Sequence, residues 1–141
     1  MAAHGGDARL TELPPYECWR LVEENVQDVG IARVVWTGTQ GPAIVPVNYA
    51  VADGAVWFQT SPESRLAREC PGQEVLVEVD HVEPATHSGW SVVATGGAEL
   101  MSIDEVPNIL GSLRVWPGGD HTVFVRVEPE HLTGRRLLPH N

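Results

Sequence analysis

The sequence contains no lysine, and all nine of its basic residues are arginine. Without a lysine amine, the protein cannot form a Schiff base with pyridoxal phosphate or with a carbonyl substrate. The phosphate-binding loop that depends on a lysine is absent for the same reason, and no Gly-x-Gly-x-x-Gly pattern follows a predicted strand. These absences exclude lysine-dependent carbonyl chemistry and the two common nucleotide-binding loops.

Cysteine is scarce as well, and the two cysteines lie far apart. Cys18 and Cys70 do not form the Cys-x-x-Cys spacing that is typical of redox and zinc sites. We interpret both as small buried apolar residues or free thiols. The acidic and histidine residues between positions 80 and 87 have neither a helical nor a zinc-finger spacing, so we expect no metal site there.

Acidic residues outnumber basic ones, which gives a formal net charge of −10 and an isoelectric point of about 4.9. Nucleic acids and anionic membranes select a basic face, so we expect neither as a partner. No segment approaches the ~20 consecutive apolar residues of a membrane span. The first ten residues also lack the apolar core of a signal peptide, and we expect a cytoplasmic protein.

The length of the chain indicates a single folding unit. A chain of 141 residues can bury about two-thirds of its unfolded surface around one core. Residues 1–9 are small and polar, and we expect them to form a flexible amino-terminal arm. Residues 10–141 are then expected to form one domain.

Hydrophobic patterning predicts a β-rich fold. Apolar and polar residues alternate in at least six short segments that are separated by glycine-rich turns, and an Asp53-Gly54 pair indicates a tight hairpin. The predicted strands are 29–37, 42–51, 55–60, 73–82, 90–100 and 121–128, and residues 133–138 could add another. Helical spacing predicts an amphipathic helix to about Glu24 and short helices after Ser61 and Asp104. We therefore predict an all-β Greek-key barrel with peripheral helices.

One segment combines features that suit an anion. Ser61 can cap a helix whose first residue is Pro62, and hydroxyls from Thr60, Ser61 and Ser64 lie beside the guanidinium of Arg65. Free backbone N–H groups at a helix start and an arginine fork would together bind phosphate. A well-capped surface helix without a ligand explains the same residues, and both interpretations are open at this point.

The segment VPVNYAVADGAVWFQTSPESRL, residues 45–66, resembles the core of the pyridoxamine 5′-phosphate oxidase-like flavin-binding proteins, in particular the short branch that includes nitroimidazole-resistance-type reductases. In that family a Thr-x-x-x-Ser-Arg segment holds the FMN phosphate, which implies Thr60, Ser64 and Arg65 here. The order of the remaining strands also fits, so the resemblance implies an FMN-binding split β-barrel. Ile44, Tyr49 and Leu66 stand where true pyridoxamine phosphate oxidases have basic residues, so we do not expect oxidation of that substrate.

The resemblance also implies further site residues. The strand Pro46, Val47, Asn48 and Tyr49 would line the flavin ring by backbone contacts, and Asp80 or Trp90 would lie near the ribityl chain. Four residues are candidates for the substrate side, although packing or surface ion pairing explains them equally well: Trp116, His121, Arg126 and Arg135.

Two functions from different classes remain open. The first is a flavin-dependent oxidoreductase that acts on a small substrate such as a nitro or quinone-like compound. The second is a non-catalytic protein that stores or senses flavin, deazaflavin or haem, because the same fold can serve either. An open barrel is too shallow to enclose a flavin alone, so the resemblance also implies a homodimer in which the second subunit completes the site.

Overall fold

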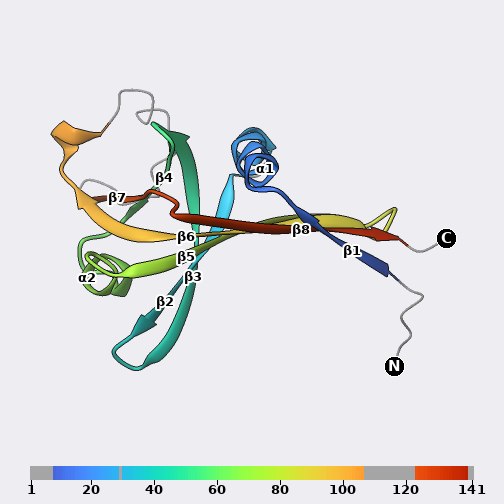
Figure 1. The fold of residues 1–141 in the computed structure, drawn as a ribbon. Coiled ribbons are helices and arrows are strands. Elements are labelled where there is room, and N and C mark those ends of the chain that lie inside the picture. Colours follow the sequence, from blue (N-terminus) through green and yellow to red (C-terminus); the bar gives the residue numbers. More distant parts are fainter. Residues whose placement is uncertain (1–7, 29, 107–122, 140–141) are drawn as a thin grey trace.

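The computed structural model describes residues 8–28, 30–106 and 123–139. Strands dominate this part of the chain, with one long helix and two short helical segments (Figure 1). In chain order the elements are β1 (Ala8–Leu13), α1 (Pro15–Asp28), β2 (Ile31–Gly38), β3 (Gly41–Ala52), β4 (Ala55–Thr60), α2 (Arg65–Glu69), β5 (Glu74–Glu83), β6 (Ser88–Met101), the 3-10 turn η2 (Ile103–Glu105), β7 (Val123–Val127) and β8 (His131–Pro139).

Six strands close into a barrel in the order β2-β3-β4-β7-β6-β5, and β5 pairs again with β2. Closure depends on β3, which pairs with β2 over residues 41–48 and with β4 over residues 49–52. The turn from β3 to β4 is Asp53-Gly54, and both residues have positive φ (52° and 72°), as the predicted tight hairpin requires. All of these pairings are antiparallel, and the fold is the predicted β-rich split barrel with peripheral helices.

The remaining two strands extend the sheet beyond the barrel, in the order β1-β8-β6 (Figure 1). Helix α1 packs against one face of this extension (Figure 1). A Cβ atom at Gly134 of β8 would lie only 2.7 Å from Cys18 Sγ of α1, so glycine is required for this close approach. The extension also joins both ends of the described chain, because β1 pairs with β8 from Ala8 to Leu13.

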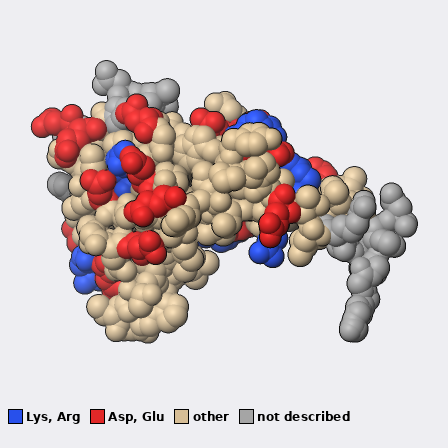
Figure 2. Space-filling view, viewed as in Figure 1, with Lys and Arg blue, Asp and Glu red and all other residues tan. Residues whose placement is uncertain are grey.

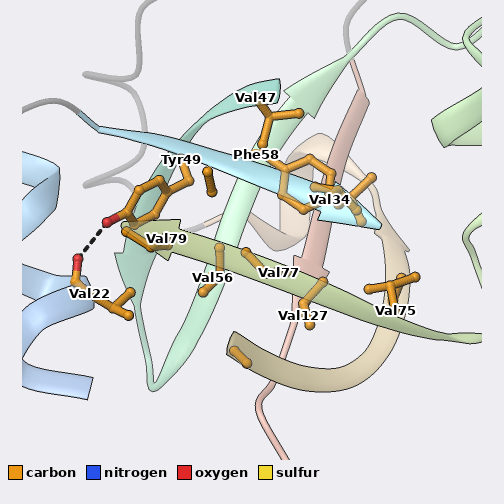
Figure 3. Packing of buried hydrophobic residues seen from close by; sticks show 14 of the residues in the cluster. Val22, Val34, Val47, Tyr49, Val56, Phe58, Val75, Val77, Val79 and Val127 are labelled. Carbon is orange, nitrogen blue, oxygen red and sulfur yellow. Dashed lines mark hydrogen bonds between the residues drawn. The ribbon is translucent and has the colours of Figure 1, made fainter. Parts of the chain in front are cut away.

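The barrel interior is filled by alternate residues of every strand, as Figure 3 shows for valines of β2, β3, β4, β5 and β7. Tyr49 is the polar exception, with only 2% of its surface exposed. Its hydroxyl donates to the Val22 carbonyl at 2.6 Å and accepts from Asn25 Nδ2 at 3.3 Å, which fixes α1 to β3 (Figure 3). Burial raises the pKa of Tyr49 to about 12, so the hydroxyl remains a donor.

Several local predictions needed correction. Strand β1 was not predicted, and its first residues fall in the segment interpreted as an arm, of which residues 1–7 lie outside the described residues. The predicted loop between strands 73–82 and 90–100 is shorter than expected, because β5 and β6 stay paired to Glu83 and Ser88. Near Asp104 the structure describes only η2, and the rest of the predicted helix lies outside the described residues. No helix in the described part of the chain is long and apolar enough to span a membrane.

Tyr49→Phe should lower the free energy of unfolding by about 1–3 kcal/mol, because the buried Asn25 amide loses its hydroxyl partner. The matched control is Tyr16→Phe, since Tyr16 is 76% exposed and its replacement should change stability by no more than about 0.5 kcal/mol. Urea unfolding of both variants checks this, and equal stabilities would contradict the role of the Tyr49 hydroxyl.

Candidate anion site at the β4–α2 turn

The turn between β4 and α2 is tighter than the sequence predicted. The Ser64 N–H donates to the Ser61 carbonyl at 3.0 Å, which makes residues 61–64 a four-residue turn with Pro62 in its second position. The helix therefore begins at Arg65 with Ser64 as its N-cap, and not at Pro62 with Ser61 as the cap. Because α2 has only five residues, its dipole contributes little, and the charge of the site comes from arginine side chains.

The hydroxyl groups of the turn are arranged so that one proton is available to a ligand. Ser64 Oγ accepts from the Ala67 N–H at 3.0 Å and lies 2.7 Å from Thr60 Oγ1. The two hydroxyls have two protons, and their mutual hydrogen bond uses one of them. The backbone N–H groups of Arg65 and Leu66 also precede the first hydrogen bond within α2. Ser61 is different, because its hydroxyl is bonded to Glu63 at 2.8 Å.

Arg65 is held on one edge by Glu69. Its Nε donates to Glu69 Oε2 at 3.1 Å and its Nη2 donates to Glu69 Oε1 at 3.3 Å. The guanidinium also lies over the Trp36 ring, 6.0 Å from the centroid. Nη1 and the second N–H of Nη2 have no partner among the described residues, and this edge of the fork is free for a bidentate anion.

Glu69 is in turn fixed by the β2–β3 hairpin. Its carboxylate accepts from Trp36 Nε1 at 2.9 Å and from the Thr39 N–H and Oγ1, each at 3.4 Å. The hydrogen bonds from Arg65 and Trp36 lower the pKa of Glu69 to about 2. Because the pKa of Glu69 is depressed in the folded state, its ionised carboxylate stabilises the fold at pH values above its unfolded pKa of about 4.5. This stabilisation of the fold is lost as the pH falls toward 2.

Strand β3 offers a backbone edge beside this turn. Residues 41–48 pair with β2 on one side, and their other edge has no partner strand in the described part of the chain. Val47 and Tyr49 point into the core, whereas Pro46 and Asn48 point outward. The pairing of β3 with β4 ends at Tyr49 and Phe58, so Thr60 follows the point at which the two strands separate. The predicted ring-binding strand and the phosphate segment therefore lie at the same opening.

Asp80 and Trp90 lie elsewhere in the chain. Asp80 accepts from Arg33 Nη1 at 3.1 Å, and the Trp90 ring stacks against His81 with 6.4 Å between centroids. Asp80 is six residues along β5 from Glu74, the end of β5 near α2, which corresponds to ~20 Å of strand. These two predicted residues therefore do not meet the β4–α2 turn within one chain.

The predicted substrate-side residues are also separated. Arg126 lies over the Trp57 ring and forms ion pairs with Glu99 and Glu128 at 3.1 and 2.8 Å. Arg135, on the outer face of β8, has no ion-pair or hydrogen-bond partner among the described residues, and it lines a hollow of about 440 Å³ together with Leu10, Asp80 and Trp90. The other two, Trp116 and His121, lie outside the described residues.

An acidic pair lies on the outer face of the same sheet. Glu78 Oε1 and Asp80 Oδ2 are each 3.1 Å from Arg33 Nη1, so two carboxylates share one guanidinium nitrogen. Burial and the neighbouring Asp80 raise the pKa of Glu78 to about 7 despite Arg33. Glu78 is thus the one described carboxyl group with a strongly raised pKa.

The cysteines and the acidic residues do not form an evident reactive centre. Cys18 and Cys70 are buried, and desolvation raises the pKa of both thiols, that of Cys70 to about 11. The described residues contain no group of three or more His, Cys, Asp or Glu side chains arranged to hold a metal ion. Independence of metals stays a prediction, which elemental analysis would check.

Sequence reasoning missed two residues of the anion site, Trp36 and Glu69. The spacing of Arg65 and Glu69 is i, i+4, which is a visible signal for a side-chain pair on a helix. Trp36 could not be found in this way, because its contact with Glu69 spans 33 residues and depends on the barrel.

Comparison with known proteins identifies the family. The model of the pyridoxamine 5′-phosphate oxidase family matches residues 15–136, so the chain belongs to this family. The sequence is 33% identical over 135 residues to the uncharacterized protein Rv0080 of Mycobacterium tuberculosis, a match that covers 92% of this chain and 86% of the relative.

Solved structures share the fold. The FAD binding protein of Mycobacterium smegmatis is 30% identical, with a TM-score of 0.67, and the match covers 91% of this chain and 98% of that one. The FAD and heme binding protein of the same organism also has a TM-score of 0.67, with 92% and 74% of the two chains covered. Its identity is 14%, so this likeness shows the fold alone.

Raising the pH from 5 to 8 should destabilise the wild type more than Glu78→Gln. A carboxyl pKa raised from 4.5 to about 7 means that the folded state binds the extra proton in this window, so stability falls as pH rises through it. Thermal melts at both pH values check this, with Glu74→Gln, an exposed residue of the same strand, as the control. If Glu78→Gln loses as much stability over this pH range as the wild type and Glu74→Gln do, the raised pKa of Glu78 is refuted.

Proposed function

We propose that this protein is a flavin-binding oxidoreductase that holds the phosphate of FMN or FAD at the β4–α2 turn. The observation that carries the proposal is the free edge of the Arg65 guanidinium, on the residue that directly follows the Thr60–Ser64 hydroxyl pair. Family membership and the FAD-binding relative support a flavin over other phosphate-bearing ligands.

The donor set at this turn fits a phosphate. A flavin phosphate has between one and two negative charges and three acceptor oxygens. Arg65 supplies a charged bidentate edge, the Thr60–Ser64 pair supplies one hydroxyl proton, and the backbone N–H groups of Arg65 and Leu66 remain unpaired within α2. Ser61, which was also predicted to contribute, would first have to release Glu63.

The ring of the flavin would lie along the unpaired edge of β3, where residues 46–48 present backbone groups; Tyr49, also predicted to line the ring, pairs with Phe58 of β4. The flavin itself supplies the redox chemistry by accepting and returning a hydride, so no nucleophile of the protein is required. The task of this chain is to fix the phosphate and to hold the ring against the strand. A small nitro or quinone-like compound is the proposed oxidising substrate.

The second candidate is a non-catalytic protein that stores or senses flavin, deazaflavin or haem. It is retained because a solved structure with this fold is named for binding both FAD and heme. The absorbance spectrum of the purified protein distinguishes oxidised flavin, deazaflavin and haem. Steady oxidation of a reduced nicotinamide by the flavin-loaded protein would support the oxidoreductase, whereas bound flavin without turnover would support the binder.

We also propose that the protein is a cytoplasmic homodimer with no nucleic acid or membrane partner. Of the seven exposed large apolar side chains among the described residues, five lie on the outer face of the sheet β1-β8-β6-β5-β2-β3: Leu10, Ile31, Ile44, Leu76 and Val82. Residues 37–48 contain no charge, and the end of the β2–β3 hairpin is correspondingly tan at the bottom of Figure 2. A second copy would cover this apolar face.

The dimer gives the distant predicted residues a role. Asp80, Trp90 and Arg135 line one hollow, and Asp80 lies six residues along β5 from Glu74, the end of β5 near α2. If the outer faces of two subunits pack together, each hollow could complete the partner's flavin site on the ribityl or substrate side. Arg135, which lacks a described partner, would then be available to a substrate carboxylate.

Arg65→Ala should weaken FMN binding roughly tenfold or more, and Ser64→Ala should weaken it less. A charge-assisted contact contributes about 1.5–3 kcal/mol, whereas a neutral hydroxyl contributes about 0.5–1.5 kcal/mol. Fluorescence titration with FMN checks both, and Arg20→Ala, which removes an exposed arginine of α1, is the matched control. Unchanged affinity in Arg65→Ala would show that the phosphate lies elsewhere.

Leu76→Glu should shift the protein from dimer to monomer, because it introduces charge near the centre of the apolar outer face. Leu100→Glu is the control, since Leu100 is 49% exposed but lies outside this face. Sedimentation at micromolar concentration measures both variants and the wild type. A monomeric wild type that still binds flavin tightly would contradict the two-subunit site.

A further inference from the structure

We infer that Glu69 is a positioning residue that sets the orientation of Arg65 for an anion and couples it to the β2–β3 hairpin. This inference rests on the proposed function, because it assumes that Arg65 binds the flavin phosphate. It assigns a role to a carboxylate that, from charge alone, would be expected to repel the ligand.

The Arg65 guanidinium has two edges that can each bind a partner, and Glu69 occupies one of them. Glu69 takes the Nε and Nη2 edge of Arg65 in a bidentate pair, at 3.1 and 3.3 Å. Arginine has five N–H donors in a rigid plane, so occupation of this edge leaves the Nη1 and Nη2 edge directed away from Glu69. The acidic partner therefore orients the cation without blocking it.

Glu69 is itself held by residues of the β2–β3 hairpin, outside helix α2. Three donors of the hairpin reach its carboxylate, namely Trp36 Nε1, the Thr39 N–H and the Thr39 hydroxyl. Only 13% of the Glu69 side chain is exposed, against 43% for Arg65. A five-residue helix with arginine preceding glutamate would not fix this pair by itself, so the hairpin sets its geometry.

The ion pair also packs closely against Gly38, the last residue of β2. A Cβ atom there would overlap Glu69 Oε1 and would lie 2.6 Å from Arg65 Nη2. Gly38 is not among the described glycines with positive φ, so an added side chain would strain no backbone dihedral but would have to displace the ion pair. The hairpin backbone, Glu69 and Arg65 thus form one closely packed unit.

Two opposite effects of Glu69 on a phosphate can be separated by experiment. Its negative charge disfavours an anion, whereas its hydrogen bonds fix the arginine that binds the anion. Glu69→Gln removes the charge and presents an amide N–H or a single acceptor to Arg65, so the bidentate pair is lost. Gly38→Ala keeps the charge but displaces the pair.

We expect both Glu69→Gln and Gly38→Ala to weaken FMN binding by roughly three- to tenfold, as the loss of a positioned charge-assisted contact implies. Two controls match them. Glu74→Gln makes the same charge change at an exposed residue without a contact to Arg65, and Gly97→Ala adds a methyl group at a strand glycine with nothing within 4 Å. Both controls should bind FMN as the wild type does. Riboflavin, which lacks the phosphate, should bind all five proteins equally.

A double-mutant cycle with Arg65→Ala distinguishes positioning from a structural role. If Glu69 acts through Arg65, Glu69→Gln should cause no further loss of FMN affinity in the Arg65→Ala background. Its effect on the melting temperature should persist there, because in both backgrounds the amide offers only one acceptor oxygen to the donors of Trp36 and Thr39, where the carboxylate offers two.

The outcomes separate this inference from the proposed function. If Arg65→Ala weakens FMN binding but Glu69→Gln leaves it unchanged or tightens it, the positioning role is overturned and the phosphate site stands. The positioning role would also be overturned if Glu69→Gln lowered FMN affinity equally in the wild-type and Arg65→Ala backgrounds. If the wild type does not bind FMN, or Arg65→Ala binds it normally, the proposed function and the inference fall together.

Discussion

The change of partner within strand β3 is the constraint on which the rest of the structure depends. β3 pairs with β2 up to Asn48 and with β4 from Tyr49 onward, which closes the barrel and leaves one edge of residues 41–48 without a partner strand in the described chain. At the same point the Tyr49 hydroxyl bonds to the Val22 carbonyl and fixes α1 against the barrel. The same change of partner therefore closes the barrel and leaves the open strand edge.

The anion site follows from this opening. β4 ends at Thr60 where it has separated from β3, and the tight turn that follows brings Arg65 back to the β2–β3 hairpin. There Glu69 accepts hydrogen bonds from Trp36 and Thr39 and orients the arginine. Backbone topology therefore provides both the proposed phosphate site and the open strand edge proposed for the flavin ring.

The sequence predicted those features that are local. Alternation of apolar residues identified the barrel strands, and Asp53-Gly54 identified the hairpin. Strand β1 was missed because it is stabilised only by pairing with β8, more than 120 residues later. The helix start was misplaced because Ser61-Pro62 suits a turn as well as a cap, and the bonds of Ser64 to the Ser61 carbonyl and to the Ala67 N–H decide between them. Trp36 and Glu69 meet only in the folded barrel.

The central claim is that a flavin phosphate is bound at the β4–α2 turn, and a crystal structure of the FMN complex tests it most directly. The account predicts phosphate oxygens within about 3.2 Å of the Arg65 guanidinium and of a hydroxyl of the Thr60–Ser64 pair, with the Arg65–Glu69 pair intact. A phosphate bound at any other place on the chain, with Arg65 turned away from it, would contradict the account.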